Sequence, residues 1–244
     1  MKWTVIGYWG GYPAEKSATS GYLLECGGFR LLVDCGSGVL AQLQSFSGIR
    51  ELDAVLVSHY HHDHVADIGP LQFARLVESY TTGPLPVLPI YGHREDEDGF
   101  ARLSYKTYTQ GQAYDPNGIL SIGPFSVSFM KTKHPVDCYA MKITDGRDSI
   151  VYTADSAYLP GFAKFAEGAD LLVCESNFYA GQDASAAGHM TCTEAASIAS
   201  DAGVGRLLLT HLPHFGNHEE LVRQAREIYN GDVQLAYTGW TWGR

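Results

Sequence analysis

The run His59-Tyr60-His61-His62-Asp63-His64 directly follows an apolar segment, residues 54–58, whose composition predicts a buried β-strand. Neutral imidazole is the commonest metal ligand in proteins, and an aspartate adds a hard oxygen donor. So many imidazoles in one short loop are costly in water, and a divalent cation relieves that cost by taking their lone pairs. A histidine-rich surface loop is the alternative, and the HxHxDH spacing after a strand argues against it. The run therefore predicts a metal site at a strand end.

Three further apolar segments also lead to a candidate metal ligand. The segment over 125–131 leads to His134, the one over 149–154 to Asp155, and the one over 207–210 to His211. Taken singly, each has a plain alternative: His134 precedes a proline as a loop residue would, and Asp155 could cap the next segment. Because rigid strands carry functional groups on the loops at their ends, the set together predicts one site assembled from separate parts of the chain.

The composition sets limits on the class of protein. The 244 residues are 45% hydrophobic and 18% charged, as in a globular protein, and the net charge of −10 disfavours long polyanions as partners. No run of about 18 apolar residues occurs, so we expect no membrane span. The first residues lack the apolar core of a signal peptide, and we expect a cytoplasmic protein. The five scattered cysteines form no CxxC pair and are expected to be reduced core residues.

No linker or low-complexity tract divides the chain, so we expect a single domain over residues 1–244. Strands are expected over 4–6, 22–25, 31–34, 54–58, 86–91, 125–131, 138–144, 150–153, 171–174, 207–210 and 234–237, and helices over 39–46, 68–78, 193–201 and 219–229. Clusters of antiparallel strands interrupted by single helices predict two packed sheets with helices outside. The polar, tyrosine-rich residues 92–116 are expected to be a partly helical excursion that forms one wall of a pocket.

Taken together, these residues resemble the metallo-β-lactamase superfamily over nearly the whole chain. The resemblance implies an α/β protein with a four-layer αββα sandwich and a metal site at one edge of its two sheets. It assigns seven metal ligands: His59, His61 and His134 for a first ion, Asp63, His64 and His211 for a second, and Asp155 as the bridge between them. Because every ligand atom is nitrogen or oxygen, zinc is favoured for the two divalent ions, while manganese and iron stay open. His62 lies between ligands and is expected to point away from the metals.

Within that superfamily the sequence is similar to the tRNA 3′-processing endonuclease branch (tRNase Z) and its phosphodiesterase relatives. The glycine loop over 7–13 and the turn Asp34-Cys35-Gly36 match that branch, and Asp34 is expected to be structural. Glu175 and His189, in the stretches Leu172-Val173-Cys174-Glu175 and Gly188-His189-Met190-Thr191, match a pair that relays a proton near the leaving group. The alternative for His189 is a cap on the helix expected after Thr191.

The resemblance implies a dinuclear hydrolase, and most closely a phosphodiesterase, in which a hydroxide bridging the two metals is the nucleophile. Asp63 would ligate and accept a proton, and His189, oriented by Glu175, would protonate the leaving group. Only twenty residues, 135–154, separate His134 from Asp155, too few for the arm that clamps tRNA. We therefore expect a small or short nucleotide-type substrate instead of full-length tRNA. A lactonase or thioesterase of the same fold and a non-catalytic metal-binding accessory protein are the alternatives, and the resemblance is compatible with a homodimer.

Overall fold

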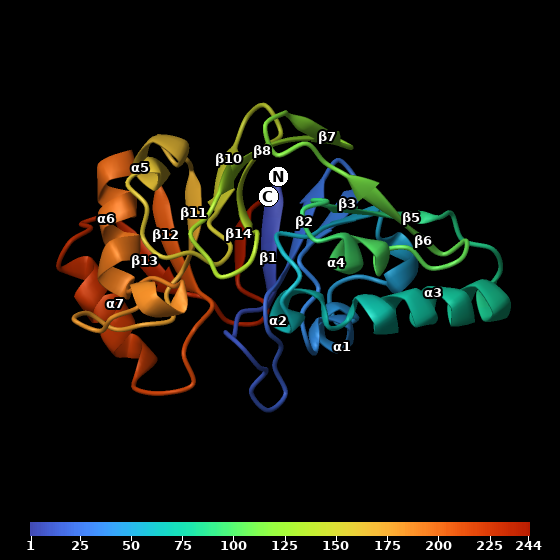
Figure 1. Ribbon diagram of the computed structural model, residues 1–244, viewed down its shortest axis with the longest axis horizontal. Coiled ribbons are helices and arrows are strands. Elements are labelled where there is room, and N and C mark those ends of the chain that lie inside the picture. The colour runs from blue at the N-terminus through green and yellow to red at the C-terminus, as the bar shows by residue number, and fades with distance from the viewer. The chain divides into compact units, whose positions relative to one another are not determined.

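The computed structural model describes residues 1–244 and divides them into two compact units. Unit 1 is Met1–Asp115 with Tyr237–Arg244, and unit 2 is Pro116–Ala236. Each unit contains one seven-stranded sheet (Figure 1). The expectation of a single domain over the whole chain stays a prediction.

Unit 1 is built on the sheet β14-β1-β2-β3-β4-β5-β6. Its elements are, in chain order, β1 (Lys2–Gly7), β2 (Gly21–Cys26), β3 (Phe29–Val33), α1 (Val39–Leu43), the short 3-10 helix η1 (Ile49–Glu51), β4 (Ala54–Leu56), α2 (His62–Val65), α3 (Ile68–Thr82), β5 (Leu88–Gly92), α4 (Glu97–Ala101), β6 (Thr109–Ala113) and β14 (Thr241–Gly243). Strands β1, β2 and β3 form an antiparallel meander, and β3 to β6 run parallel. The parallel strands are joined by helical crossovers, as this geometry requires.

The core of unit 1 lies between one face of its sheet and the helices α1 and α3. Alternate strand residues point to this face because side chains in a strand have a period of two. Leu32, Val55 and Ile90 come from three neighbouring strands, and they form one buried cluster with Leu43 of α1 and Leu71 of α3. This packing holds β4, and with it the segment that follows β4, in a fixed position.

Unit 2 is built on the sheet β13-β12-β11-β10-β9-β8-β7. Its elements are β7 (Leu120–Ile122), β8 (Phe125–Lys131), β9 (Tyr139–Thr144), β10 (Ser149–Tyr152), α5 (Gly161–Phe165), β11 (Leu171–Glu175), the 3-10 helix η2 (Ser185–Ala187), α6 (Cys192–Ala202), β12 (Arg206–Thr210), α7 (His218–Arg226) and β13 (Asp232–Leu235). Strands β7 to β10 are antiparallel, and β10 to β13 are parallel. Helix α6 begins at the capping box that the sequence predicts, formed by Thr191 and Glu194.

The strand directions decide where the loops gather. In unit 1, β1, β3 and β4 run the same way, so the segments that follow them leave from one edge of the sheet. In unit 2 the same holds for β8, β10, β11 and β12. The carboxyl ends of parallel strands are the usual place for ligand-binding loops in open α/β sheets. Each sheet therefore has one edge suited to carry functional side chains.

Two expectations about the elements are corrected by the structure. The strands do not form only antiparallel clusters, because the second half of each sheet is parallel and is connected by strand-helix-strand crossovers. Residues 92–116 contain the expected helix, α4, but residues 109–113 form β6, which pairs with β5 at the edge of the sheet. The sequence Thr-Gln-Gly-Gln-Ala of β6 lacks an apolar alternation, because an edge strand buries fewer side chains.

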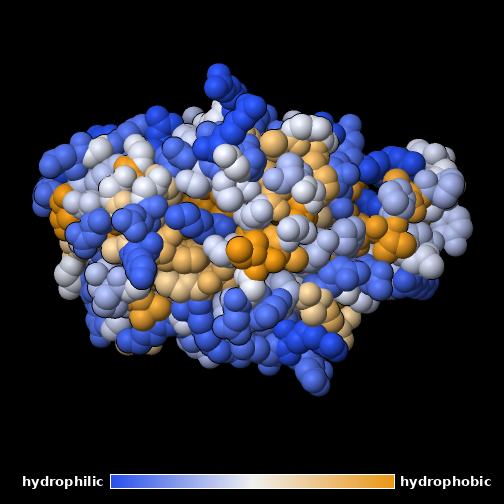
Figure 2. Space-filling view, turned by 90° about the horizontal axis from the view of Figure 1, so that it is seen from above, coloured by the Kyte–Doolittle hydropathy of each residue, from blue (hydrophilic) through white to orange (hydrophobic).

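The surface and the cysteines agree with the composition. None of the helices combines the length and apolarity that a membrane crossing requires. On the face seen in Figure 2, hydrophobic patches lie among hydrophilic side chains. All five cysteines are free thiols, and only Cys26 is not fully buried.

Candidate metal centre

In unit 1 the candidate ligands follow β4 within a few residues. His59 and His61 lie in an extended segment, and their ring centroids are 4.9 Å apart. Helix α2 begins at His62, which places Asp63 and His64 in one helical turn, where both are buried. The Nε2 atom of His64 lies 3.7 Å from Oδ2 of Asp63. The local chain thus presents three imidazoles and one carboxylate at one edge of the sheet.

Asp34, which follows β3, orients His64. Its Oδ2 lies 2.8 Å from Nδ1 of His64, and its Oδ1 accepts the backbone N–H of Ser58 at 2.8 Å. The Ser58 hydroxyl donates to the same carboxylate, and all three residues are buried. Because a carboxylate only accepts hydrogen bonds, Nδ1 of His64 carries the proton and Nε2 presents its lone pair. Asp34 is therefore structural, as expected, and its role is to position a candidate ligand.

Two glycines explain why the glycine loop and the Asp-x-Gly turn occur in this sequence. The backbone N–H of Gly11 donates to Oδ2 of Asp63 at 2.8 Å. A Cβ on Gly36 would overlap the carbonyl oxygen of Asp63, so only glycine lets the turn pack against α2. Both motifs were visible in the sequence, but their contact with Asp63 was not.

We expect the Asp34→Asn variant to be less stable by about 1–3 kcal/mol, because the amide cannot accept all the bonds that the buried carboxylate accepts. We also expect it to bind zinc about 10–100-fold more weakly, since the carboxylate no longer orients His64. Urea unfolding and competition with a zinc chelator measure the two effects. Asp53→Asn is the matched control, because Asp53 accepts a backbone N–H of Arg30 at an exposed position. Equal effects of the two substitutions would contradict the role of Asp34.

In unit 2 the candidate ligands gather at the edge where β8, β10 and β12 end. Oδ2 of Asp155 lies 3.8 Å from Nε2 of His134 and 3.3 Å from Nε2 of His211, and all three side chains are nearly inaccessible to solvent. Nδ1 of His134 bonds the carbonyl oxygen of Gly188 at 3.0 Å. The side-chain amide of Asn177 donates to the backbone carbonyl of His211 and lies 3.4 Å from its Nδ1. The sequence did not point to Gly188 or Asn177.

The ring orientations test whether a cation fits these residues. In the neutral imidazoles of His64 and His134, Nδ1 donates its proton to an oxygen atom, so Nε2 carries the lone pair. These lone pairs face carboxylate oxygens of Asp63 and Asp155, respectively. Two acceptors facing each other repel, and separations of 3.7 and 3.8 Å are too long for hydrogen bonds. Two donors bound tetrahedrally at zinc-like distances of about 2.1 Å lie about 3.4 Å apart. The donor chemistry in each unit therefore fits a bound divalent cation.

The backbone at these strand ends adopts an uncommon conformation. Asp34, Ala154 and His211 have φ angles of +56°, +51° and +51°, in the left-handed region that non-glycine residues seldom occupy. Each such residue costs roughly 1 kcal/mol or more. Ala154 directly precedes Asp155, so its left-handed conformation helps to direct the Asp155 carboxylate toward His134 and His211. Strain of this kind tends to cluster at functional sites.

The neighbouring cysteines do not contribute thiolate ligands. Cys35 follows Asp34, and burial together with the charges of Asp67 and Asp34 raises the pKa of its thiol. Burial, followed by the charge of Glu175, likewise raises the pKa of Cys174. None of the groups of residues that could hold a metal ion includes a cysteine, so their donor atoms are nitrogen and oxygen, as the sequence predicts.

Glu175, the last residue of β11, orients His189. Its Oε1 lies 2.9 Å from Nδ1 of His189 and accepts the backbone N–H of Ser156, and its Oε2 accepts the N–H of Met190. The imidazole of His189 stacks on that of His211 at 5.1 Å. The side chain of Glu175 is fully buried, while that of His189 is 17% exposed. The helix cap is Thr191, so the alternative role of His189 as the cap is wrong.

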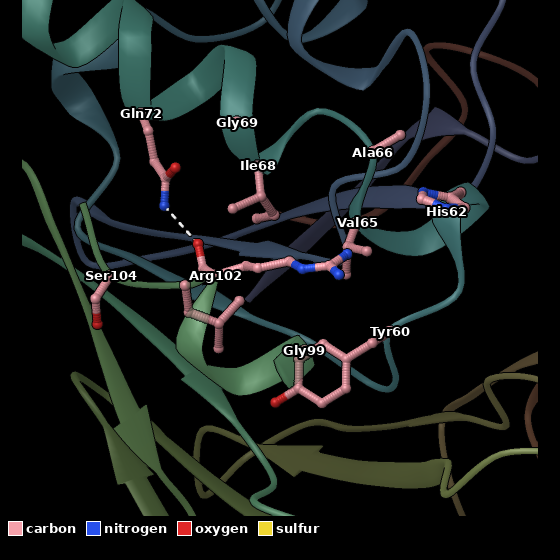
Figure 3. A pocket seen from close by; sticks show the side chains of 11 residues that line it. Tyr60, His62, Val65, Ala66, Ile68, Gly69, Gln72, Gly99, Arg102 and Ser104 are labelled. Atoms are coloured by element: carbon pink, nitrogen blue, oxygen red, sulfur yellow. Dashed lines mark hydrogen bonds between the residues drawn. The ribbon is translucent and has the colours of Figure 1, made fainter. Parts of the chain in front are cut away.

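The structure thus groups the candidate residues in two sets, one per unit. Unit 1 holds His59, His61, Asp63 and His64, and unit 2 holds His134, Asp155, Glu175, His189 and His211. Six of these residues are buried, and His61, His134 and His189 are partly buried. His62 is exposed and lines a pocket that contains no candidate ligand (Figure 3).

Comparisons with known proteins agree with this architecture. A family model described as a β-lactamase superfamily domain matches residues 29–212. The probable metallo-hydrolase YhfI of Bacillus subtilis (strain 168) is 55% identical over 242 residues, which cover 99% of each chain. The crystal structure of that metallo-β-lactamase fold protein matches with a TM-score of 0.98 over 99% of this chain and 98% of its own.

Two more distant structures share the fold alone. Human tRNase Z, short form, has a TM-score of 0.79 at 21% identity, covering 100% of this chain and 99% of its own. A diphosphatase of the PhnP family has a TM-score of 0.78 at 20% identity, covering 100% and 97%. Two mixed seven-stranded sheets with flanking helices and these matches confirm the expected fold class. The chain therefore belongs to the metallo-β-lactamase superfamily.

Proposed function

We propose that this protein is a dinuclear metal-dependent phosphodiesterase that acts on a small or short nucleotide-type substrate. The observation that carries the proposal is the Glu175–His189 pair next to the candidate ligands His134 and His211. The alkoxide that leaves a phosphodiester is a strong base and needs a proton, which a positioned imidazole can donate. A thiolate leaving group has no such need.

In this proposal the ligand sets of the two units together hold one pair of cations. His59, His61 and His134 would hold the first, Asp63, His64 and His211 would hold the second, and Asp155 would be shared. The match to the Bacillus subtilis structure, which extends over both units, supports the pairing. So does the position of Asp155, whose Oδ2 lies within 3.8 Å of both His134 and His211. Zinc suits the nitrogen and oxygen donors, and manganese or iron would also be accepted.

When bound, divalent cations acidify water and polarise a phosphoryl oxygen. The chain's own residues direct the protons. Asp63, whose Oδ2 accepts the N–H of Gly11, would accept a proton from the attacking water. Glu175 holds Nδ1 of His189, so the proton for the leaving group comes from Nε2. The buried negative charge of Glu175 stabilises the imidazolium form that donates it.

The surroundings of His189 support a nucleotide-type substrate. The ring of Phe178 lies 6.3 Å from that of His189, and Phe215, 46% exposed, lies 6.5 Å from Phe178. Aromatic side chains of this kind stack on nucleobases at about 1–3 kcal/mol per base. Half of residues 135–154 lies in β9 and β10, and the net charge of −10 opposes a long polyanion, so full-length tRNA is not proposed as the substrate.

A substrate panel tests the proposal on protein loaded with zinc or manganese. We expect a cyclic nucleotide and bis(p-nitrophenyl) phosphate to be hydrolysed with kcat/KM of about 10⁴ M⁻¹ s⁻¹ or more, while a lactone and a thioester are turned over far more slowly. The nucleotide part of the proposal also requires that a dialkyl phosphate without a base be a poorer substrate than the cyclic nucleotide.

Two outcomes of this panel would contradict the phosphodiesterase assignment. Lactone or thioester turnover without diesterase activity would show another hydrolase of the same fold. Full metal loading without turnover of any substrate class would favour a non-catalytic accessory protein.

A further inference from the structure

A pocket of about 450 Å³ lies within unit 1, beside the segment that carries the candidate ligands (Figure 3). Tyr60, His62 and Val65 of that segment line it, together with residues from α3 and from the end of α4. Its volume is in the range of about 300–1,000 Å³ that small-molecule sites occupy. None of the lining residues is a candidate metal ligand, so the proposed phosphodiesterase mechanism makes no use of this pocket.

The pocket and the candidate ligands use different side chains of one segment. Tyr60, before α2, and His62, its first residue, line the pocket, whereas His59 and His61 do not. Tyr60 forms a rigid wall: its hydroxyl donates to the carbonyl of His93 at 2.6 Å, and Gly99 leaves room for its ring where any Cβ would press against it. The pocket is thus a preformed feature lined by side chains of this segment that are not candidate ligands.

The lining combines an apolar floor with one cationic group. Val65, Ile68 and Leu103 supply apolar surface, and no aspartate or glutamate lines the pocket. The Arg102 side chain extends toward Val65 in Figure 3, and its guanidinium makes no ion pair or hydrogen bond. The backbone of Arg102 is anchored, because Gln72 Nε2 donates to its carbonyl at 2.8 Å.

The cap of α4 does not neutralise that cation. Asp96 caps α4 by accepting the N–H of Gly99 at 2.8 Å, so its carboxylate faces the helix end. Although the protein has a net charge of −10, the guanidinium of Arg102 lines this pocket without an ion-pair partner. Guanidinium groups in such positions commonly bind phosphate, sulfonate or carboxylate groups.

We propose that this pocket binds a small amphipathic anion, with its apolar ring system against Val65, Ile68 and Leu103 and its anionic group at Arg102. The inference does not depend on the proposed phosphodiesterase activity, because every lining residue belongs to unit 1. A ligand in the pocket contacts Tyr60 and His62, which are covalent neighbours of His59 and His61. Occupancy and metal binding are therefore linked, and each changes the affinity for the other by the same factor.

Two fluorescent probes that differ only in charge test the site in the zinc-loaded, full-length protein. 1-Anilinonaphthalene-8-sulfonate carries a sulfonate, and N-phenyl-1-naphthylamine is its uncharged analogue. We expect the anionic probe to saturate at one site per chain, with a Kd at least about tenfold below that of the neutral probe, which is about 1.4 kcal/mol. In Arg102→Gln that preference is expected to disappear.

A pair of substitutions at Gly69 tests the location. Nothing lies within 4 Å of a Cβ on Gly69, which lines the pocket, so a larger side chain fits there without a clash. Gly69→Phe is expected to fill the pocket and weaken the anionic probe about tenfold or more, whereas Gly69→Ala leaves space and retains binding. Both substitutions favour the helix over glycine, so loss of folding is not expected.

Three results decide the inference. Equal affinities of the two probes, or unchanged binding in both Arg102→Gln and Gly69→Phe, would overturn the site. Saturation at one site per chain in His134→Ala, a ligand variant in unit 2, with a Kd shifted only by as much as zinc removal shifts it, would confirm that the site is separate from the metal centre; loss of any saturable binding would show that the probe binds at the metals. Equal probe affinities with and without zinc would overturn the linkage.

Discussion

Replacing Asp155 with asparagine is expected to lower the bound metal from about two ions per chain to about one or fewer, and to reduce turnover at least about 10³-fold, or about 4 kcal/mol. The cause is the position of Asp155, whose Oδ2 lies within reach of both His134 and His211. An amide is a neutral and weaker ligand, and it cannot offset the charge of two cations. Elemental analysis after gel filtration and kcat/KM for a phosphodiester measure the effects.

Thermal unfolding adds a readout that does not need a substrate. A ligand that binds only the folded protein stabilises it, so zinc raises the Tm of the natural sequence, and this rise should be largely absent in Asp155→Asn. Asp201→Asn is the matched control, because Asp201 is exposed on α6. Metal content and turnover that match the control would refute the shared role of Asp155.

Replacing His189 with glutamine is expected to reduce kcat about 10²–10⁴-fold for a diester with an alkoxide leaving group, with metal content unchanged. The reason is that glutamine fills a similar space but cannot donate a proton. For a p-nitrophenyl diester, whose leaving group is a weak base, the loss should be much smaller. Comparing kcat for the two substrates therefore separates proton donation from a general structural defect.

His218→Gln provides the control for this experiment. The ring of His218 lies in the same unit and bonds the carbonyl oxygen of Pro213 at 2.7 Å, and His218 belongs to none of the groups that could hold a metal. We expect both diesters to be turned over normally by this variant. Equal losses of kcat for the two leaving groups in His189→Gln would show that His189 acts through the structure of the site and not as a proton donor.

The sequence alone was informative about ligand identity because the relevant patterns are local. An apolar strand that leads within a few residues to His59, His134, Asp155 or His211 is visible without knowledge of the fold. The strand-end positions are confirmed, since β4, β8, β10 and β12 each end within a few residues of the candidate that was expected. Whether these residues bind metal in solution stays a prediction.

Other contacts could not be predicted because they join residues far apart in the chain. Asp34 reaches His64 across 30 residues, Gly188 reaches His134 across 54, and Gly11 reaches Asp63 across 52. No periodicity connects such positions, and each motif was recognisable only as a resemblance. The edge strand β6 was missed for a related reason, because its pairing with β5 is set by the sheet and not by its own polar sequence.

The sequence by itself determined which residue types stand at the strand ends, since strand period and hydrophobic burial are properties of neighbouring residues. Only the tertiary structure decided which nitrogen of each imidazole points to a carboxylate, through the Asp34–His64 and Gly188–His134 contacts. It also decided that Tyr60 and His62, within the same histidine run, line a pocket with Arg102. The physical reason is that ring orientation and pocket shape depend on packing between distant segments, which local sequence does not encode.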